Sequence, residues 1–130
     1  MADLTFNDKN NQKKKISAFA SGTIATSATM NDTLFTLPAN SLVTAVYAIV
    51  TTASGTATDT VDVKVGSTVV ANEVVVGVLG VASGTVAKTF FPTGGVVTVV
   101  AGADAPDAAG RIRIVVEYIE VELTDGQYTN

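Results

Sequence analysis

The sequence predicts an all-β protein, an antiparallel β-sandwich of jelly-roll-like type with flexible or extended termini. A seven-stranded immunoglobulin-like sandwich is the alternative. Three observations predict this class. Beyond residue 15 the chain is rich in valine and threonine, which favour strands, and poor in residues that favour helices. Its apolar runs are short. Turn clusters of glycine, proline, serine and asparagine separate these runs at intervals of about ten residues.

Each expected strand ends at a turn with a physical cause. Pro38 cannot donate a ladder hydrogen bond and is closely followed by Asn40, a turn residue. Gly66–Ser67 predicts a tight hairpin, and the loops around Gly55, Gly84 and the pair at 94–95 supply further breaks. The expected strands are residues 17–28, 33–37, 41–52, 58–65, 67–76, 85–91, 95–100 and 111–118, and the last can extend to residue 123.

The last strand reverses its pattern. Its apolar face is expected to carry Ile112, Ile114, Val116 and Tyr118, but from residue 119 the apolar side chains stand on the opposite side. Either the strand bulges near residues 117–119, or its last part packs on a neighbouring subunit. We expect the second, with three interface residues that share one side of the strand: Ile119, Val121 and Leu123.

Charge divides the chain into three parts. Residues 1–15 form a polar, lysine-rich N-terminal arm with a net charge of +2; residues 16–118 form the sandwich domain, and residues 119–130 form a C-terminal extension. The remainder after the arm carries −6, so it does not suit nucleic acid, whose binding needs positive charge. The arm is either a solvated terminus or a basic segment that docks on an acidic protein surface. In the second case its contacts are Lys13, Lys14 and Lys15.

The segment 41–52 is apolar on both sides, unlike a strand with one face in water. Strict alternation would place Val43, Ala45, Tyr47 and Ile49 on one side and the other apolar residues opposite them. Charged residues make up 15% of the chain, against about 25% in typical soluble domains. We therefore expect other subunits to cover part of the exterior. The alternative is simple exposure of small apolar side chains.

No catalytic or cofactor site is expected. The chain has no histidine and no cysteine, which removes the commonest general base and metal ligands. Two carboxylate pairs, Asp59 with Asp62 and Asp104 with Asp107, lie in or beside turns and are read as turn residues. The larger aromatic residues are expected in the core: Phe35, Tyr47, Phe90 and Tyr118. We expect no enzyme activity, no cofactor and no metal.

The chain shows neither a signal peptide nor an apolar run long enough to span a membrane as a helix. The longest apolar run, residues 74–82, is interrupted by Gly77 and Gly80. We expect a protein made in the cytoplasm that binds no membrane.

Several segments resemble the small β-sandwich proteins that decorate or cement the capsids of tailed bacteriophages. In that group an LPA turn leads to an LVT strand, a DV.VG segment follows, and a P.GG.VTV hairpin precedes a terminal R.VVEY strand. The corresponding residues here are Leu37–Ala39, Leu42–Thr44, Asp62–Gly66, Pro92–Val99 and Arg113–Tyr118.

This resemblance implies a virion protein that binds the outer capsid surface and stabilises the shell without catalysis. Its implied partners are the major capsid protein and copies of itself, as a dimer or trimer, with the two termini as clamps that order on assembly. Two alternatives stay open. The first is a tail, head-fibre or minor capsid component of the same virion. The second is a carbohydrate-binding module, although the chain lacks the tryptophan that such modules commonly use.

Overall fold

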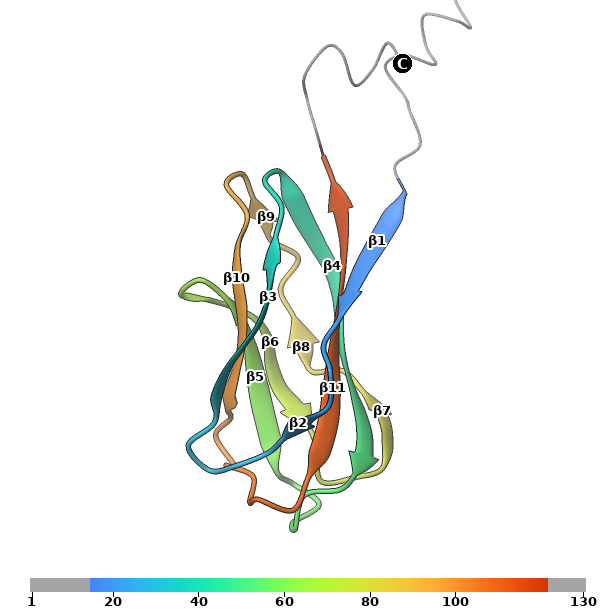
Figure 1. The fold of residues 1–130 in the computed structure, drawn as a ribbon, viewed down its shortest axis with the longest axis vertical. Coiled ribbons are helices and arrows are strands. Elements are labelled where there is room, and N and C mark those ends of the chain that lie inside the picture. Colours follow the sequence, from blue (N-terminus) through green and yellow to red (C-terminus); the bar gives the residue numbers. More distant parts are fainter. Residues whose placement is uncertain (1–14, 122–130) are drawn as a thin grey trace, which may run out of the picture.

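The computed structural model describes residues 15–121, which form two antiparallel β-sheets packed face to face (Figure 1). Sheet A contains β1 (Ile16–Ala20), β2 (Ile24–Ala25), β4 (Ser41–Thr52), β7 (Gly80–Ala82), β9 (Phe90–Phe91) and β11 (Arg111–Glu120). Sheet B contains β3 (Asn31–Leu37), β5 (Thr60–Val65), β6 (Thr68–Val75), β8 (Thr85–Val86) and β10 (Gly95–Ala101). The all-β sandwich prediction is confirmed. None of the described residues is helical, so this part of the chain holds no helix that could cross a membrane.

The order of strands in sheet A is β1-β11-β4-β7, with β2 also paired to β11 and β9 also paired to β4. In sheet B the order is β3-β10-β5-β6-β8. The long strands β4 and β11 lie together at the centre of sheet A. The described chain begins and ends at the same end of the sandwich, where β1 starts and β11 stops (Figure 1).

The core lies between the two sheets and is built mainly from valine. Strand β11 contributes Ile112, Ile114, Val116 and Tyr118, as the alternation of the sequence predicts. Strand β10 contributes Val97 and Val99 from the facing sheet. Valine and isoleucine suit this position because their branched side chains are stiff and pack closely on a pleated surface.

Strand β4 contains two bulges where it pairs with β11. Glu117 of β11 pairs with Ala45 but Tyr118 pairs with Val43, so Thr44 is an extra residue. Its hydroxyl donates a 3.3 Å hydrogen bond to the Glu117 carbonyl oxygen. Thr51 is extra in the same way and donates to the Arg111 carbonyl oxygen at 3.1 Å.

The first of these bulges corrects the expected faces of β4. Strict alternation grouped Val43 with Ala45, Tyr47 and Ile49, but Val43 is buried whereas the other three are half-buried on the outer face of sheet A. The extra residue moves every later side chain to the opposite face, because side chains alternate with a period of two. The inward set is Ser41, Val43, Val46, Ala48 and Val50.

Two expected strands are each divided in two in the structure, and one observed strand was not expected. Residues 17–28 form β1 and β2, separated where Ser21 enters the ladder and its hydroxyl oxygen accepts a hydrogen bond from the Ile114 N–H at 2.9 Å. Residues 85–91 form the two short strands β8 and β9, in different sheets. Strand β7 was not expected, because it begins at Gly80 and follows Gly77 closely, and these glycines obscure its pattern.

The expected aromatic core is correct for two residues and wrong for two. Tyr118 is buried, and Phe35 packs half-buried against the core. The ring of Phe19 stacks on both, with centroid distances of 5.1 Å to Phe35 and 5.5 Å to Tyr118. Tyr47 and Phe90 instead belong to the outer face of sheet A, where Phe90 is 42% exposed. Their apolar character alone did not distinguish the inner face from the outer one.

Candidate partner-binding surface

Four large apolar side chains form a continuous row across the outer face of sheet A. Ile16 of β1 pairs with Ile119 of β11, Ile119 pairs with Leu42 of β4, and Leu42 pairs with Phe90 of β9. Residues that pair across strands place their side chains on the same face of the sheet. We call these four residues the terminal row, because they lie where the described chain begins and ends (Figure 1).

The terminal row is accessible to a partner. Ile16 is 58% exposed and Phe90 is 42% exposed, while Leu42 and Ile119 between them are half-buried. The next level of the face holds Glu117 between two alanines, so a single charged side chain borders the row there. Exposed apolar side chains that form a contiguous patch are typical of interaction sites, whereas isolated ones are not.

The structure locates three of the six interface residues that the sequence predicted. Ile119 belongs to the terminal row, and Val121 is half-buried just beyond it, with its N–H donating to the Asn40 carbonyl oxygen at 2.7 Å. Lys15 is exposed directly before Ile16. The other three predicted residues lie outside the described part of the chain: Lys13, Lys14 and Leu123. Their role at an interface stays a prediction.

The reversal of pattern in the last strand has a local explanation. Side chains of β11 alternate regularly through Tyr118, and the bulged residue at this level is Thr44 in β4. Glu120 has the same parity as Tyr118 but is exposed, because it lies at the end of the strand, past the core. The strand therefore keeps its geometry while its last residues extend beyond the core.

The outer face of sheet A stays largely apolar away from the terminal row. Ala20, Val115 and Tyr47 form another row, and Ile49 pairs with Val81, which is 70% exposed. Arg111 and Arg113 are the charged residues that β11 places at this end of the face. The β6–β7 loop adds two exposed apolar side chains, Val78 and Leu79.

The outer face of sheet B differs in chemistry. One level across it carries Thr33, Thr98, Lys64 and Val69, which are threonines, a lysine and one valine. Val96, 43% exposed, pairs with Thr36 rather than with another large apolar residue. Isolated exposed valines among polar neighbours need no partner to cover them. The apolar outer face is therefore a property of sheet A.

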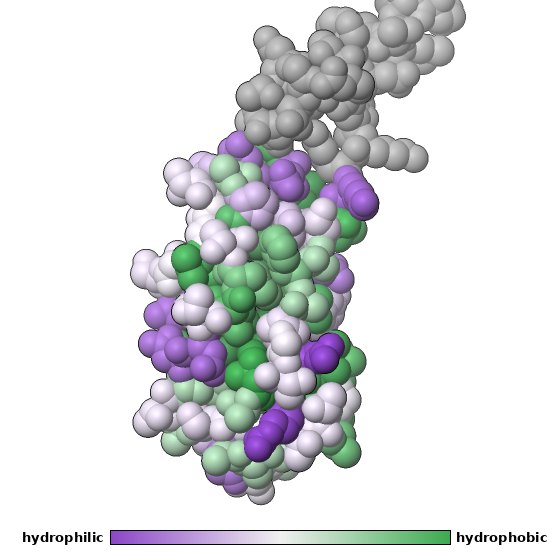
Figure 2. Space-filling view, viewed as in Figure 1, coloured by the Kyte–Doolittle hydropathy of each residue, from purple (hydrophilic) through white to green (hydrophobic). Residues whose placement is uncertain are grey.

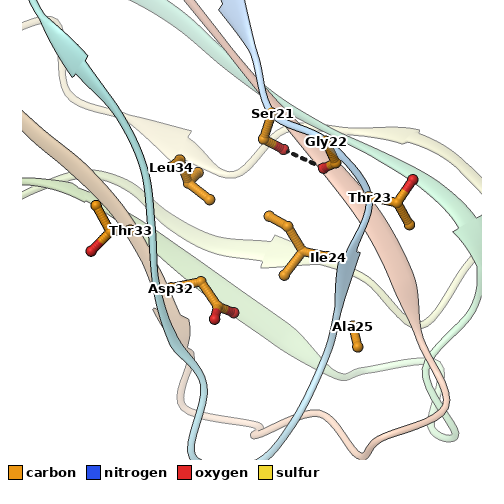
Figure 3. Close-up of a pocket in the computed structure, with 8 residues that line it drawn as sticks. All are labelled: Ser21, Gly22, Thr23, Ile24, Ala25, Asp32, Thr33 and Leu34. Carbon is orange, nitrogen blue, oxygen red and sulfur yellow. Dashed lines mark hydrogen bonds between the residues drawn. The ribbon is translucent and has the colours of Figure 1, made fainter.

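A groove opens between the edges of the two sheets, with a volume of about 410 Å³ (Figure 3). On one side it is lined by the stretch from Ser21 to Ala25, and on the other by Asp32, Thr33 and Leu34 of β3. The side chains of Ile24 and Leu34 point into it from opposite sides, and Asp32 is directed into it from β3. Figure 2 shows hydrophobic side chains along the middle of this side of the molecule, between more hydrophilic flanks.

The turn aspartates form a structural network at the other end of the sandwich. The buried carboxylate of Asp59 accepts hydrogen bonds from the Ser54 hydroxyl at 2.5 Å and the Thr56 N–H at 3.1 Å. Asp107 Oδ1 accepts from the N–H groups of Ala109 and Gly55, at 2.9 and 3.0 Å. These bonds fix the loops that connect the sheets, and they confirm the reading of Asp59 and Asp107 as turn residues. The same reading is wrong for Asp62, which lies within β5 and accepts a hydrogen bond from the Glu73 N–H at 2.8 Å.

The hydrogen bonds to Asp107 also affect its ionisation. Donation from the Ala109 N–H, then from the Gly55 N–H and the Ser54 hydroxyl, stabilises the carboxylate and lowers its pKa below the ordinary value of 3.8. Partial desolvation raises the pKa, and its effect is smaller than that of either backbone N–H but larger than that of the Ser54 hydroxyl. Within residues 15–121, no group of three or more acidic side chains is arranged to hold a metal ion.

Sequence reasoning missed three residues of the terminal row: Ile16, Leu42 and Phe90. Leu42 stands in a segment with two apolar sides, so its face depended on the bulge at Thr44. Phe90 was assigned to the core. The sequence does contain more apolar residues than one inner face can hold. This excess predicts that part of the exterior is apolar, but it does not indicate which residues lie there.

No family model matches this chain, and no curated protein matches it. Among solved structures, it is similar to a chain of the cyanophage Pam1 capsid asymmetric unit, with a TM-score of 0.54 and 17% sequence identity. The similarity covers 84% of this chain and 87% of that chain. At this level of identity, the likeness shows that the two chains share a fold.

Proposed function

We propose that this protein is a structural component of a bacteriophage virion, of the decoration or cement type. It binds the outer surface of the capsid, stabilises the shell and performs no catalysis. The observation that carries this proposal is the terminal row, an apolar surface that the domain itself does not cover. The shared fold with a chain of a cyanophage capsid asymmetric unit supports the virion as its location.

The proposed binding mode follows from the chemistry of the surface. Covering Ile16 and Phe90 removes apolar area from water, at about 25 cal/mol for each Å². A ring of weaker contacts excludes water around such anchors, which is the usual arrangement in stable interfaces. Many copies on one shell add avidity, so each single contact can be modest.

The N-terminal arm and the C-terminal extension complete the proposed interface. Both adjoin the terminal row, because Lys15 precedes Ile16 and Val121 follows the end of β11. Lys13, Lys14 and Lys15 would meet acidic groups of the major capsid protein or of a neighbouring copy. Leu123 would extend the apolar surface of Ile119 and Val121.

We also propose that the sandwich is a jelly roll. What supports this is the path of the chain, which passes from sheet A to sheet B and back repeatedly instead of forming successive hairpins. β5 and β6 are consecutive strands that pair with each other, whereas β3 and β4, or β10 and β11, lie in different sheets. Repeated crossing between two sheets is typical of paired Greek keys.

Binding to capsids tests the proposed function. Purified full-length protein is mixed with capsids that lack it, and the particles are sedimented. We expect saturable cosedimentation and, in a reconstruction of the particles, added density on the outer surface. Absence of binding, or density at the tail or at a head fibre, would contradict the cement role; the second result would support the alternative virion location.

A truncation tests the C-terminal part of the interface. Because β11 runs to Glu120, truncation after Val121 removes Leu123 while keeping the whole strand. We expect an unchanged melting temperature and weaker cosedimentation with capsids. If the truncated protein binds as well as the full chain, the extension is not part of the interface.

A further inference from the structure

The groove between β2 and β3 is bordered by strands with unused pairing capacity. Within the described residues, β1 and β2 pair only with β11, and β3 pairs only with β10. Each of these edge strands therefore has one side on which an additional strand could pair. An extended segment that adds to such an edge gains backbone hydrogen bonds, and side chains on one of its faces can fill adjacent pockets.

The lining of the groove defines what would fill it. Ile24 and Leu34 supply apolar contacts from the two sides, and Asp32 supplies a negative charge. Its volume of about 410 Å³ lies within the range of about 300–1,000 Å³ that is typical of ligand sites. A suitable occupant is an extended segment with apolar side chains on one face and positive charge close by.

The first 14 residues of the chain have this composition. Leu4 and Phe6 stand two residues apart, so an extended segment would present both on one face. Asp3 precedes them, and the polar stretch 7–14 that follows includes Asp8 and three lysines, Lys9, Lys13 and Lys14, so residues 1–14 carry a net charge of +1. The arm as a whole is positive and the body is negative, so the two are complementary in charge.

We propose that Leu4 and Phe6 of one copy occupy the groove of a second copy, with the arm pairing along the free edge of β3. This inference rests on the proposed function, because it names a neighbouring copy as the partner of the arm. The stretch 7–14 then acts as a spacer of about 26 Å when extended. It contains neither glycine nor proline, and its lysines repel one another, which favours extension over a return to its own domain.

Engineered cysteines test this arrangement, because the chain has none of its own. One copy carries Phe6→Cys, and the other carries Ala25→Cys, which replaces one small exposed residue of the groove by another. The two proteins are mixed at high concentration and oxidised. We expect a disulfide-linked dimer between the two variants. The matched control mixes Phe6→Cys with Val96→Cys, which is exposed on the outer face of sheet B, and should give only background crosslinking.

A double variant distinguishes the neighbouring copy from the same chain. If Phe6→Cys and Ala25→Cys in one chain form an intrachain disulfide, and the mixed single variants form none, the arm occupies its own groove and the proposal is wrong. Absence of any crosslink above background also overturns it. Because the experiment uses free protein, its result is independent of capsid binding, which tests the proposed function separately.

Changes to the arm provide a second measurement. Leu4→Ser combined with Phe6→Ser removes both apolar anchors, whereas Thr5→Ser combined with Asn7→Ser alters the opposite face of the same segment. We expect the first pair to shift the full-length protein toward monomer in analytical ultracentrifugation, and the second pair to leave its oligomeric state unchanged. Equal oligomerisation of both variants would contradict the proposal.

Discussion

The two ends of the sandwich differ in which of their side chains find partners within the domain. At the loop end, formed by residues 26–30, 53–59 and 102–110, polar groups are satisfied within the domain by the bonds of Asp59 and Asp107. At the terminus end, where β1 begins and β11 stops, the domain leaves the apolar terminal row uncovered. Figure 1 shows these regions at opposite ends of the long axis.

This difference indicates that residues important for folding and residues available for binding a partner lie at opposite ends of the sandwich. Among the described residues, no buried side-chain nitrogen or oxygen lacks a hydrogen-bond partner, so the buried polar side chains of the loop end are satisfied within the domain. Exposed apolar side chains gain free energy only when another surface covers them. We therefore expect substitutions at the loop end to change folding, and substitutions at the terminus end to change association.

The largest effect on stability is expected at Asp59. Asp59→Ala removes the acceptor of the Ser54 hydroxyl and the Thr56 N–H, and an unsatisfied buried group costs about 1–3 kcal/mol. Urea unfolding should show this loss, while capsid binding below the transition stays unchanged. Asp59→Asn is the matched control, because its amide oxygen can still accept. If Asp59→Ala is as stable as the wild type, the network does not hold the loops.

The largest effect on association is expected at Ile16. Ile16→Asp places a charge in the terminal row, and loss of an interface anchor costs about 2 kcal/mol or more, roughly a 30-fold weaker affinity. Its melting temperature should change little, because the side chain is 58% exposed. Val96→Asp introduces the same charge on sheet B and should bind capsids normally. Equal loss of capsid binding in both variants would show that binding does not depend specifically on the outer face of sheet A.

A smaller effect is expected from the charge of Asp107. Because folding lowers its pKa, the carboxylate stabilises the fold fully above the ordinary value of 3.8, and this contribution disappears as pH falls through the lowered pKa. Melting temperatures of the wild type and Asp107→Asn should differ at neutral pH and converge in acid. If the two melting temperatures still differ in acid, the charge of Asp107 does not cause the difference in stability.

Substitution of Leu79 is expected to have the smallest effect on both stability and capsid binding. This side chain is 65% exposed in the β6–β7 loop, away from the terminal row, so Leu79→Ser should change stability by less than about 0.5 kcal/mol. Capsid cosedimentation should also be unchanged. Loss of binding would show that the interface extends to this loop and would remove the contrast between the two ends.

The sequence predicted those strands and turns that depend on residues close together in the chain. Strand β4 was predicted with its observed bounds, and the inward residues of β11 follow directly from its alternation. Turn residues such as Pro38 and Gly66 act through their own backbone preferences, so their effect does not depend on the rest of the chain. The same holds for Asp59 and Asp107, whose turns are built from nearby N–H groups.

Part of the candidate site was also predictable. The reversal after Tyr118 indicated Ile119 and Val121, because a change of parity is visible in a single strand; Ile119 lies in the terminal row and Val121 just beyond it, while their contact with a partner stays a prediction. The other members of the terminal row were not identified. Ile16, Leu42 and Phe90 come from three different strands, and no local pattern indicates that these strands are aligned at the level of Ile119.

By itself, then, the sequence determined the all-β class, the bounds of β4 and the excess of apolar side chains over one core. Only the tertiary structure decided which of those side chains face outward. The physical reason is the extra residue Thr44: a bulge reverses the faces of the strand beyond it, and it exists only relative to the partner strand β11. Register between strands likewise depends on contacts across the sheet, so the terminal row became visible only when four separate strands were paired.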